Sequence, residues 1–135
     1  MKLGLIGKTL EHSFSKQYFN EKFKQQALKG YSYQNFELSN INEIKQLVVD
    51  QQLDGFNVTI PYKETILPFL DEVDEVAKEI GAVNTVKVSW SDNNFKLIGY
   101  NTDAFGFHQL IKPFFKSRHE RILVLGTGGA SKAVA

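Results

Sequence analysis

Short apolar runs of strand length alternate along this chain with longer segments whose apolar residues recur at helical spacing. The strand-like runs of the first half are residues 3–7, 33–38 and 55–59. Strands that alternate with helices pair in a parallel or mostly parallel sheet, because each helix carries the chain back across the sheet. We therefore predict an α/β fold, with a mostly parallel sheet and helices on both faces.

The helix-like segments have recognisable beginnings and ends. Residues 15–29 carry aromatic side chains on one face and are followed by Gly30, a residue type that ends helices. Pro61 fits the first position of a short helix that reaches about residue 67. Further helices are predicted over residues 41–52, over 71–80 and from 102 to Pro113, with a hairpin over 85–90 and 95–99.

The stretch RILVLGTGGASKAVA, residues 121–135, is an apolar run that enters a glycine-rich turn. A dinucleotide-binding βαβ unit begins in this way, since glycines allow the tight turn and a close approach to a pyrophosphate. A buried parallel strand needs a neighbour on each side, and the sequence ends shortly after Gly126. We expect a first domain over residues 1–116 and, over 117–135, a connector and the truncated start of a Rossmann domain.

The composition excludes several classes of function. A formal net charge of +1 argues against nucleic acid as the main partner. The absence of cysteine rules out disulfides and thiolate metal sites, and it fits a reducing compartment. The apolar run before Lys8 is too short for a signal peptide or a membrane span. We expect a cytoplasmic protein without membrane partners or metal sites, in which the acidic residues of 71–79 lie on a solvated helix face.

The first strand leads into Gly7-Lys8-Thr9 and then to Ser13 and Ser15. A nucleotide phosphate loop would need a glycine at position 2, which is lysine. The two serines stand where a helix begins, and a helix N-terminus offers unpaired amides and a partial positive charge. We predict a small-anion site here, of a kind that the residues alone do not define.

Lys63 breaks a local preference, because it lies in the first turn of the helix after Pro61, at the positive end of the helix dipole. Such violations concentrate at functional sites, although an exposed lysine is the commoner outcome for this residue type. Asp103 lies in the first turn of a later helix, where a carboxylate is stabilising and needs no functional explanation. Lys63, Asp103 and Asn84 nevertheless follow predicted strands, as the serine loop does, and we expect one cleft.

Four blocks of sequence, in order and at compatible spacing, resemble the substrate-binding domain of shikimate dehydrogenases. They are GLIGKTLEHSFSKQYFN, GFNVTIPYKE, GAVNTV and GYNTDAFGF, and the turn GTGGAS follows them. The resemblance covers nearly the whole chain and implies an NADP-dependent oxidoreductase. Members of this family reduce 3-dehydroshikimate to shikimate with NADPH, in the shikimate pathway of chorismate and aromatic amino-acid biosynthesis.

The resemblance implies a role for each candidate residue, carried over by position. Ser13 and Ser15 would hold the substrate carboxylate, and Lys63 would be the catalytic acid–base residue with Asp103 as its partner. The residues implied to contact shikimate or 3-dehydroshikimate are Ser13, Ser15, Thr59, Lys63, Asn84 and Asp103. The turn implied to meet the NADP phosphates is Gly126, Thr127, Gly128, Gly129 and Ala130, and Glu75 matches an acidic position near the cofactor.

The chain departs from the family pattern at two loop prolines, which are replaced by Thr9 and Lys16. It also lacks the cofactor domain, which in the family supplies a substrate-contacting glutamine. We therefore expect no turnover from these 135 residues alone. A relative that acts on quinate, or a non-catalytic module that binds a small carboxylate, is an alternative interpretation. The unpaired run 122–125 is expected to be irregular or to exchange between copies, and a homodimer is a further alternative.

Overall fold

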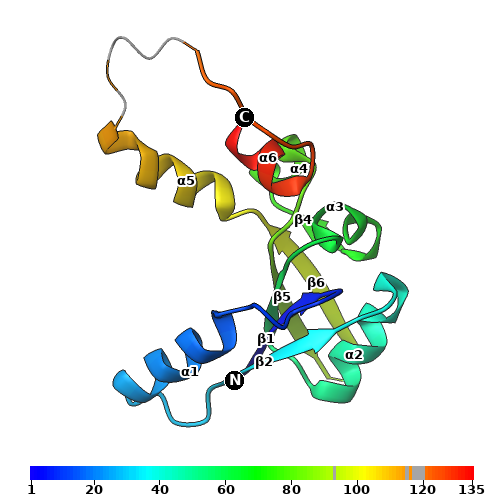
Figure 1. Ribbon diagram of the computed structural model, residues 1–135. Coiled ribbons are helices and arrows are strands. Elements are labelled where there is room, and N and C mark those ends of the chain that lie inside the picture. Colours follow the sequence, from blue (N-terminus) through cyan, green and yellow to red (C-terminus); the bar gives the residue numbers. More distant parts are fainter. Residues whose placement is uncertain (93, 115, 117–120) are drawn as a thin grey trace.

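The computed structural model describes residues 1–92, 94–114, 116 and 121–135, and it contains a six-stranded sheet (Figure 1). The order of the strands across the sheet is β2-β1-β3-β5-β6-β4. The pairs β1–β2, β1–β3 and β4–β6 are parallel, whereas β5 runs antiparallel to both β3 and β6. The mostly parallel α/β sheet that we predicted is confirmed. The strands are β1 (Lys2–Gly7), β2 (Ser32–Glu37), β3 (Gly55–Val58), β4 (Glu72–Val73), β5 (Thr85–Ser91) and β6 (Asn94–Tyr100).

Helices follow most of the strands. The described α-helices are α1 (Ser15–Gln25), α2 (Ile44–Gln51), α3 (Tyr62–Thr65), α4 (Glu75–Ile80), α5 (Asp103–Ile111) and α6 (Gly129–Val134). Short 3-10 turns precede α2 and follow α3 and α5, at Ile41–Glu43, Leu67–Phe69 and Lys112–Phe114. The last of these turns contains Pro113, which ends the helix as predicted.

Buried side chains form two groups on opposite faces of the sheet, because alternate residues of a strand point to opposite sides. The larger group, which includes Ile6 and Leu97, lies on the face that α2, α3 and α4 cover. The smaller group lies under α1, where Phe23 packs with Leu5. Figure 1 shows α1 on one side of the strands and α2 on the other. On the α1 face, β5 residues such as Lys87 are exposed.

The prediction of a single helix over residues 71–80 is wrong for its first part, which forms β4 beside β6. Asp71 fixes this pairing, because its N–H donates to the Leu97 carbonyl at 2.9 Å and its carboxylate accepts the Leu97 N–H at 2.7 Å. The helix begins only after Asp74, whose carboxylate accepts the Val76 N–H at 3.1 Å. Tertiary hydrogen bonds to β6 therefore override the local helical pattern.

α1 also differs from the prediction, because it ends at Gln25 and not at residue 29. Ala27 has a left-handed backbone, with φ of 52°, which interrupts the helix before the glycine. Gly30 is left-handed too, with φ of 80°, and completes the turn into β2.

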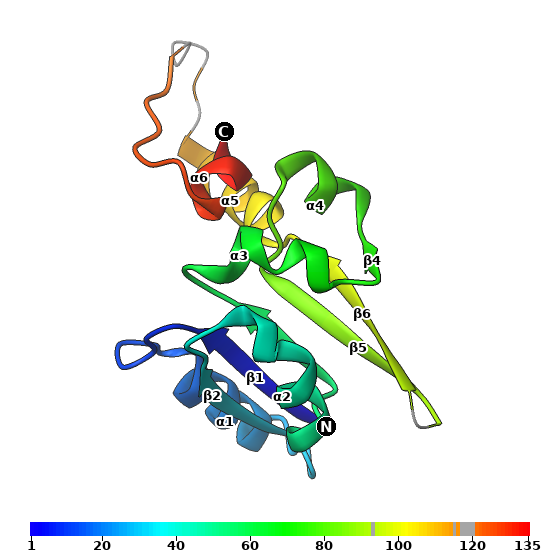
Figure 2. The same ribbon diagram turned by 90° about the vertical axis from the view of Figure 1, so that its right-hand side faces the viewer.

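Residues 121–127 form neither helix nor strand, and Ile122, Leu123 and Leu125 are 62%, 82% and 84% exposed. The predicted strand of the glycine-turn unit is thus absent from the described residues, whereas the helix after the turn is present as α6. α6 lies beside α4 and α5 (Figure 2). Most of the predicted connector, residues 117–120, lies outside the described residues, as does Asn93 of the hairpin turn.

Within the described ranges, no helix is long and apolar enough to cross a membrane. The same residues contain no group of three or more His, Cys, Asp or Glu side chains that could hold a metal ion.

Candidate active site

Two charged side chains from distant parts of the chain meet at one end of the sheet. Lys63 lies in α3, shortly after β3, and Asp103 begins α5, shortly after β6. The Lys63 ammonium donates to Asp103 Oδ2 at 2.5 Å. The two side chains are 15% and 32% exposed, so water screens the pair only in part and a ligand can still reach it. An ammonium in such a position can stabilise negative charge on a bound oxygen and give it a proton.

The backbone around Lys63 is anchored to the core. Tyr62 is buried, and its hydroxyl donates to the Leu38 carbonyl at 2.5 Å. Ile66, one helical turn later, is fully buried. The Lys63 carbonyl accepts the Val83 N–H at 2.7 Å, which ties α3 to the segment before β5. Lys63 is therefore positioned by the core and by that neighbouring segment, and not only by its contact with Asp103.

Asn84 connects the two sides of this pair. Its Nδ2 donates to Asp103 Oδ1 at 2.7 Å and to Thr102 Oγ1 at 2.9 Å, while its Oδ1 accepts the Thr102 N–H at 2.9 Å. Asn84 is only 8% exposed, so its amide is held in this orientation. The expectation that Asn84 follows a strand is wrong, because it precedes β5. Since β5 is antiparallel to β3 and β6, its beginning lies at the same end of the sheet as their carboxyl ends.

Asn101 is a structural support of the site that sequence reasoning missed. This buried residue donates from Nδ2 to the Ala82 carbonyl at 2.9 Å. Its Oδ1 accepts the N–H groups of Asp103 and Ala104 at 3.0 and 3.3 Å, which caps α5. The only signal in the sequence was a polar residue just before a helix, and Thr102 was an equally good cap by that criterion.

The serine loop lies beside a buried tyrosine. The Ser15 N–H donates to Ser13 Oγ at 3.3 Å, and a side-chain hydrogen bond joins Ser15 to Tyr33. Burial raises the pKa of Tyr33 far above its usual range, and the bond with Ser15 lowers it by a smaller amount. The Tyr33 hydroxyl therefore stays protonated at neutral pH and remains a hydrogen-bond donor.

Tyr33 links the serine loop to the side of the site that holds Asn84. Its hydroxyl donates to Asn57 Oδ1 at 2.8 Å, and Asn57 Nδ2 donates to Thr85 Oγ1 at 3.1 Å. The Thr85 hydroxyl donates in turn to Asn84 Oδ1 at 3.0 Å. Tyr33 and Thr85 were not among the predicted site residues, because a polar atom within a strand gives no sign of its partner on another strand.

Thr59 lies at the same end of the sheet, directly after β3. Its N–H donates to the Ile6 carbonyl and its carbonyl accepts the Tyr62 N–H, both at 2.9 Å. The structure thus places Lys63, Asn84 and Asp103 in one hydrogen-bonded group. Ser13 and Ser15 approach that group through Tyr33 and its partners.

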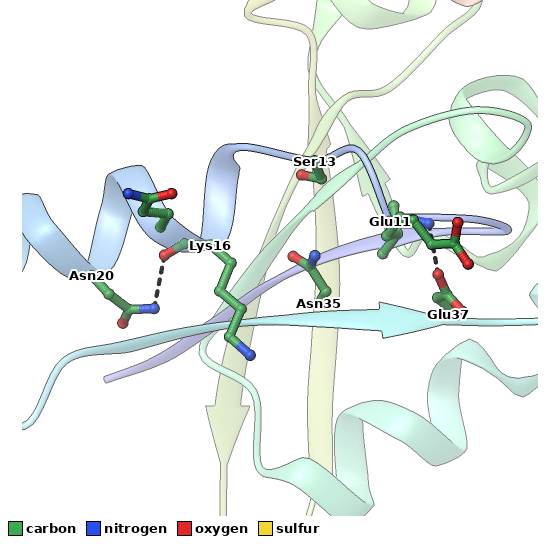
Figure 3. A pocket seen from close by; sticks show the side chains of 8 residues that line it. Glu11, Ser13, Lys16, Asn20, Asn35 and Glu37 are labelled. Atoms are coloured by element: carbon green, nitrogen blue, oxygen red, sulfur yellow. Dashed lines mark hydrogen bonds between the residues drawn. The ribbon is translucent and has the colours of Figure 1, made fainter.

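One sizeable cavity lies beside the serine loop and not at the Lys63–Asp103 pair. It has a volume of about 710 Å³ and lies between the serine loop, α1 and the edge strand β2 (Figure 3). Ser13 lines it, whereas Lys63 and Asp103 do not. The Oδ1 atom of Asn35, another lining residue, has no hydrogen-bond partner within the described residues. The volume of this cavity therefore does not single out the Lys63–Asp103 pair.

The glycine turn lies directly beside Lys63. A cavity of about 350 Å³ is lined by Ile60, Pro61, Lys63 and Glu64 on one side and by residues 128–131, at the turn and the start of α6, on the other. A side chain at Gly128 would meet no atom within 4 Å, so the turn leaves open space there. Lys132 of α6 forms an ion pair with Glu64, the residue after Lys63. This arrangement leaves room for a phosphate-bearing cofactor to lie against the turn, next to the ammonium.

The fold and the site define an α/β domain that presents a lysine–carboxylate pair, an amide and two serines at one end of its sheet. A family model described as the shikimate dehydrogenase substrate binding domain matches residues 5–86. The chain belongs to this family, as the resemblance implied.

Relatives match the chain over its whole length. It is 41% identical to the shikimate dehydrogenase (NADP(+)) of Staphylococcus epidermidis, over 100% of this chain and 49% of that protein. It is 45% identical to the Methanococcus maripaludis protein of the same name, over 98% of this chain and 47% of that protein. The chain thus spans about half the length of the curated relatives it matches.

Solved structures show the same likeness. Shikimate dehydrogenase 1 from Peptoclostridium difficile matches with a TM-score of 0.86 and 39% identity, over 98% of this chain and 48% of that one. The Thermus thermophilus shikimate 5-dehydrogenase in complex with NADP(H) and shikimate matches with a TM-score of 0.81 and 33% identity, over 100% of this chain and 50% of that one.

Proposed function

We propose that this chain is the substrate-binding part of an NADP-dependent shikimate dehydrogenase, which reversibly reduces 3-dehydroshikimate to shikimate. The observation that carries the proposal is the 2.5 Å contact between the Lys63 ammonium and Asp103, beside the Asn84 amide, in a chain of this family. The proposed substrate-binding domain is residues 1–116, and residues 117–135 are the proposed connector and start of the cofactor domain.

Reduction of a ketone requires a hydride at the carbon and a proton at the oxygen. NADPH, when bound, supplies the hydride. Lys63 donates an N–H to the oxygen on which negative charge grows, and transfers that proton as the C–O group becomes a hydroxyl. In the oxidation direction the neutral Lys63 amine accepts the proton. Asp103 orients the ammonium and is itself held by Asn84, so the position of the proton donor depends on both residues.

The remaining polar groups orient the substrate. Ser13 and Ser15 donate to the substrate carboxylate. Because the Tyr33 hydroxyl already donates to Asn57, the Ser15 hydroxyl exchanges its bond to Tyr33 for one to the carboxylate when the substrate binds. Thr59, Asn84 and Asp103 bind the ring hydroxyls. These contacts come from both ends of the hydrogen-bonded chain that runs through Asn57 and Thr85.

The glycine turn fits the phosphates of NADP. The open space at Gly128 and the cavity of about 350 Å³ beside the turn both leave room for them. The residues proposed to hold the cofactor are Gly126, Thr127, Gly128, Gly129 and Ala130. Glu75 begins α4, the helix next to α6, and is proposed to lie near the cofactor as well.

The protein is proposed to act in the cytoplasm, where a chain without cysteine needs no oxidising folding environment. Self-association is proposed to occur as a homodimer or through the exposed run 122–125, since an unpaired apolar strand seeks a partner edge.

The test of this function is NADP-dependent oxidation of shikimate by the complete dehydrogenase, with quinate as the competing substrate. We expect reduction of NADP with shikimate, and no turnover from the 135 residues by themselves. Faster turnover with quinate would assign the protein to the quinate-acting relatives. Binding of shikimate without any turnover by the complete protein would favour a non-catalytic carboxylate-binding module.

A further inference from the structure

The turn contains three glycines, Gly126, Gly128 and Gly129, and their backbone angles and neighbouring atoms differ. Gly126 has a φ of 123°, which side chains rarely allow. At Gly128 a Cβ would meet no atom within 4 Å, so no packing within the described residues requires a glycine there. At Gly129 a Cβ would lie 2.8 Å from Lys63 Cβ and 3.0 Å from Ala82 Cβ. Gly129 is therefore required by close packing within the protein itself.

Neither neighbour of Gly129 is free to move away. Lys63 Cβ is attached to backbone whose carbonyl accepts the Val83 N–H at 2.7 Å. Ala82 is fully buried, and its carbonyl accepts the Asn101 amide at 2.9 Å. Both contacts are thus with Cβ atoms, whose positions are fixed by the hydrogen-bonded backbone that carries them. A methyl group at position 129 must displace the Lys63 segment or lift α6 away from it.

A second contact holds α6 in this place. Lys132, one turn along α6, pairs with Glu64, which directly follows Lys63 in α3. These side chains are 44% and 37% exposed, so the pair contributes little stability by itself, but it fixes the register of the two helices. The glycine turn and the Lys63 segment are therefore joined at two points, Gly129 and Lys132.

We propose that Gly129 is a positioning residue for Lys63, in addition to any contact it makes with a cofactor. By packing directly on the stem of Lys63, the Gly129 backbone limits where the ammonium can lie relative to Asp103. A shift of the glycine turn on cofactor binding is then transmitted to the proton donor. The contact itself rests on the structure alone, and only its importance for proton transfer rests on the proposed function.

The test uses the 135-residue chain uniformly labelled with 15N and 13C, without cofactor or substrate. Gly129→Ala is compared with Gly128→Ala, which adds the same methyl group where nothing lies within 4 Å. Gly106→Ala, within α5 and also without a neighbour, controls for a general effect of the substitution. We expect the NMR signals of the Lys63 Cε–H group and the Asp103 amide to shift in Gly129→Ala only.

Lys132→Met provides a second variant that adds no bulk to the packed contact, in case Gly129→Ala does not fold. It loosens α6 from α3, and we expect smaller shifts of the same Lys63 signals. In the complete dehydrogenase, a misplaced proton donor should lower kcat by about tenfold in Gly129→Ala. Gly128→Ala should act mainly on the KM for NADP.

Unchanged Lys63 signals in Gly129→Ala, together with shifted signals of residues 130–132, would mean that α6 lifts away, and would overturn the inference. That outcome leaves the proposed function intact. If shikimate leaves the Lys63 signals of the wild-type chain unchanged, the proposed function is contradicted. The comparison of the glycine variants still tests whether Gly129 positions Lys63.

Discussion

The Lys63 ammonium nitrogen lies 2.5 Å from Asp103 Oδ2, although 40 positions separate the two residues in the chain. They are carried by α3 and α5, which follow β3 and β6. β5 lies between those two strands and runs antiparallel to both, so the residues before β5 meet them at one end of the sheet. The topology thus explains why Asn84 is the residue that bridges the pair.

Replacement of Lys63, the proposed proton donor, should affect the chemical step. In the complete dehydrogenase, Lys63→Met should lower kcat by about 100- to 10,000-fold, because the oxygen of the reacting carbonyl loses its acid. Lys8→Met is the matched control, since Lys8 is an exposed lysine in the first loop of the same domain. Steady-state kinetics of shikimate oxidation measure both. A Lys63→Met enzyme within threefold of the wild-type kcat is incompatible with this role.

The serine loop should control binding more than turnover. Ser15→Ala removes a hydroxyl proposed to donate to the substrate carboxylate, and should raise the KM for shikimate by about tenfold, since hydrogen bonds to charged groups contribute about 1.5 to 3 kcal/mol. Ser32→Ala, at the far end of β2, is the control. If KM rises equally in the two variants, the serine loop does not bind the substrate carboxylate.

Asn101 should matter for stability first. Asn101→Ala leaves the Ala82 carbonyl and the Asp103 N–H without their partner, and should lower the free energy of unfolding by about 1 to 3 kcal/mol. Asn101→Asp keeps the acceptor for the α5 cap but places a carboxylate oxygen against the Ala82 carbonyl, so it should be less stable than wild type as well. Urea denaturation measures both variants. An Asn101→Ala protein as stable as wild type would contradict the supporting role of Asn101.

Tyr33 gives a pH-dependent prediction. Burial raises its pKa in the folded state, so above about pH 10 an unfolded tyrosine loses its proton while the folded Tyr33 keeps it. The folded state then binds more protons, and the free energy of unfolding falls by about 1.4 kcal/mol per pH unit until the folded pKa is reached.

Other groups also titrate near pH 10, so variants are needed to isolate the contribution of Tyr33 to the pH dependence of stability. Tyr33→Phe should be less stable than wild type at neutral pH, since Asn57 Oδ1 loses its donor, and should lose less stability from pH 10 to 11. Tyr31→Phe, at an exposed tyrosine, should follow the wild-type curve. Parallel curves for wild type and Tyr33→Phe would contradict the buried, protonated hydroxyl.

The sequence allowed the class of fold and several site residues to be predicted, because strand–helix alternation and strand-end polar residues are local signals. Lys63 was recognisable because it opposes the helix dipole. Asn101, Tyr33 and Thr85 were not, since their hydrogen bonds join segments that only the folded sheet brings together. β4 was missed for the same reason, because Asp71 pairs with the distant Leu97.

Titration of the 15N-labelled 135-residue chain with shikimate tests the central claim most directly. The account predicts saturable chemical-shift changes at Ser13, Ser15, Lys63 and Asp103 together, and their loss at the serines in Ser15→Ala. Changes confined to other surfaces, such as the edge strand β2 around Asn35, with Lys63 and Asp103 unaffected, would contradict it.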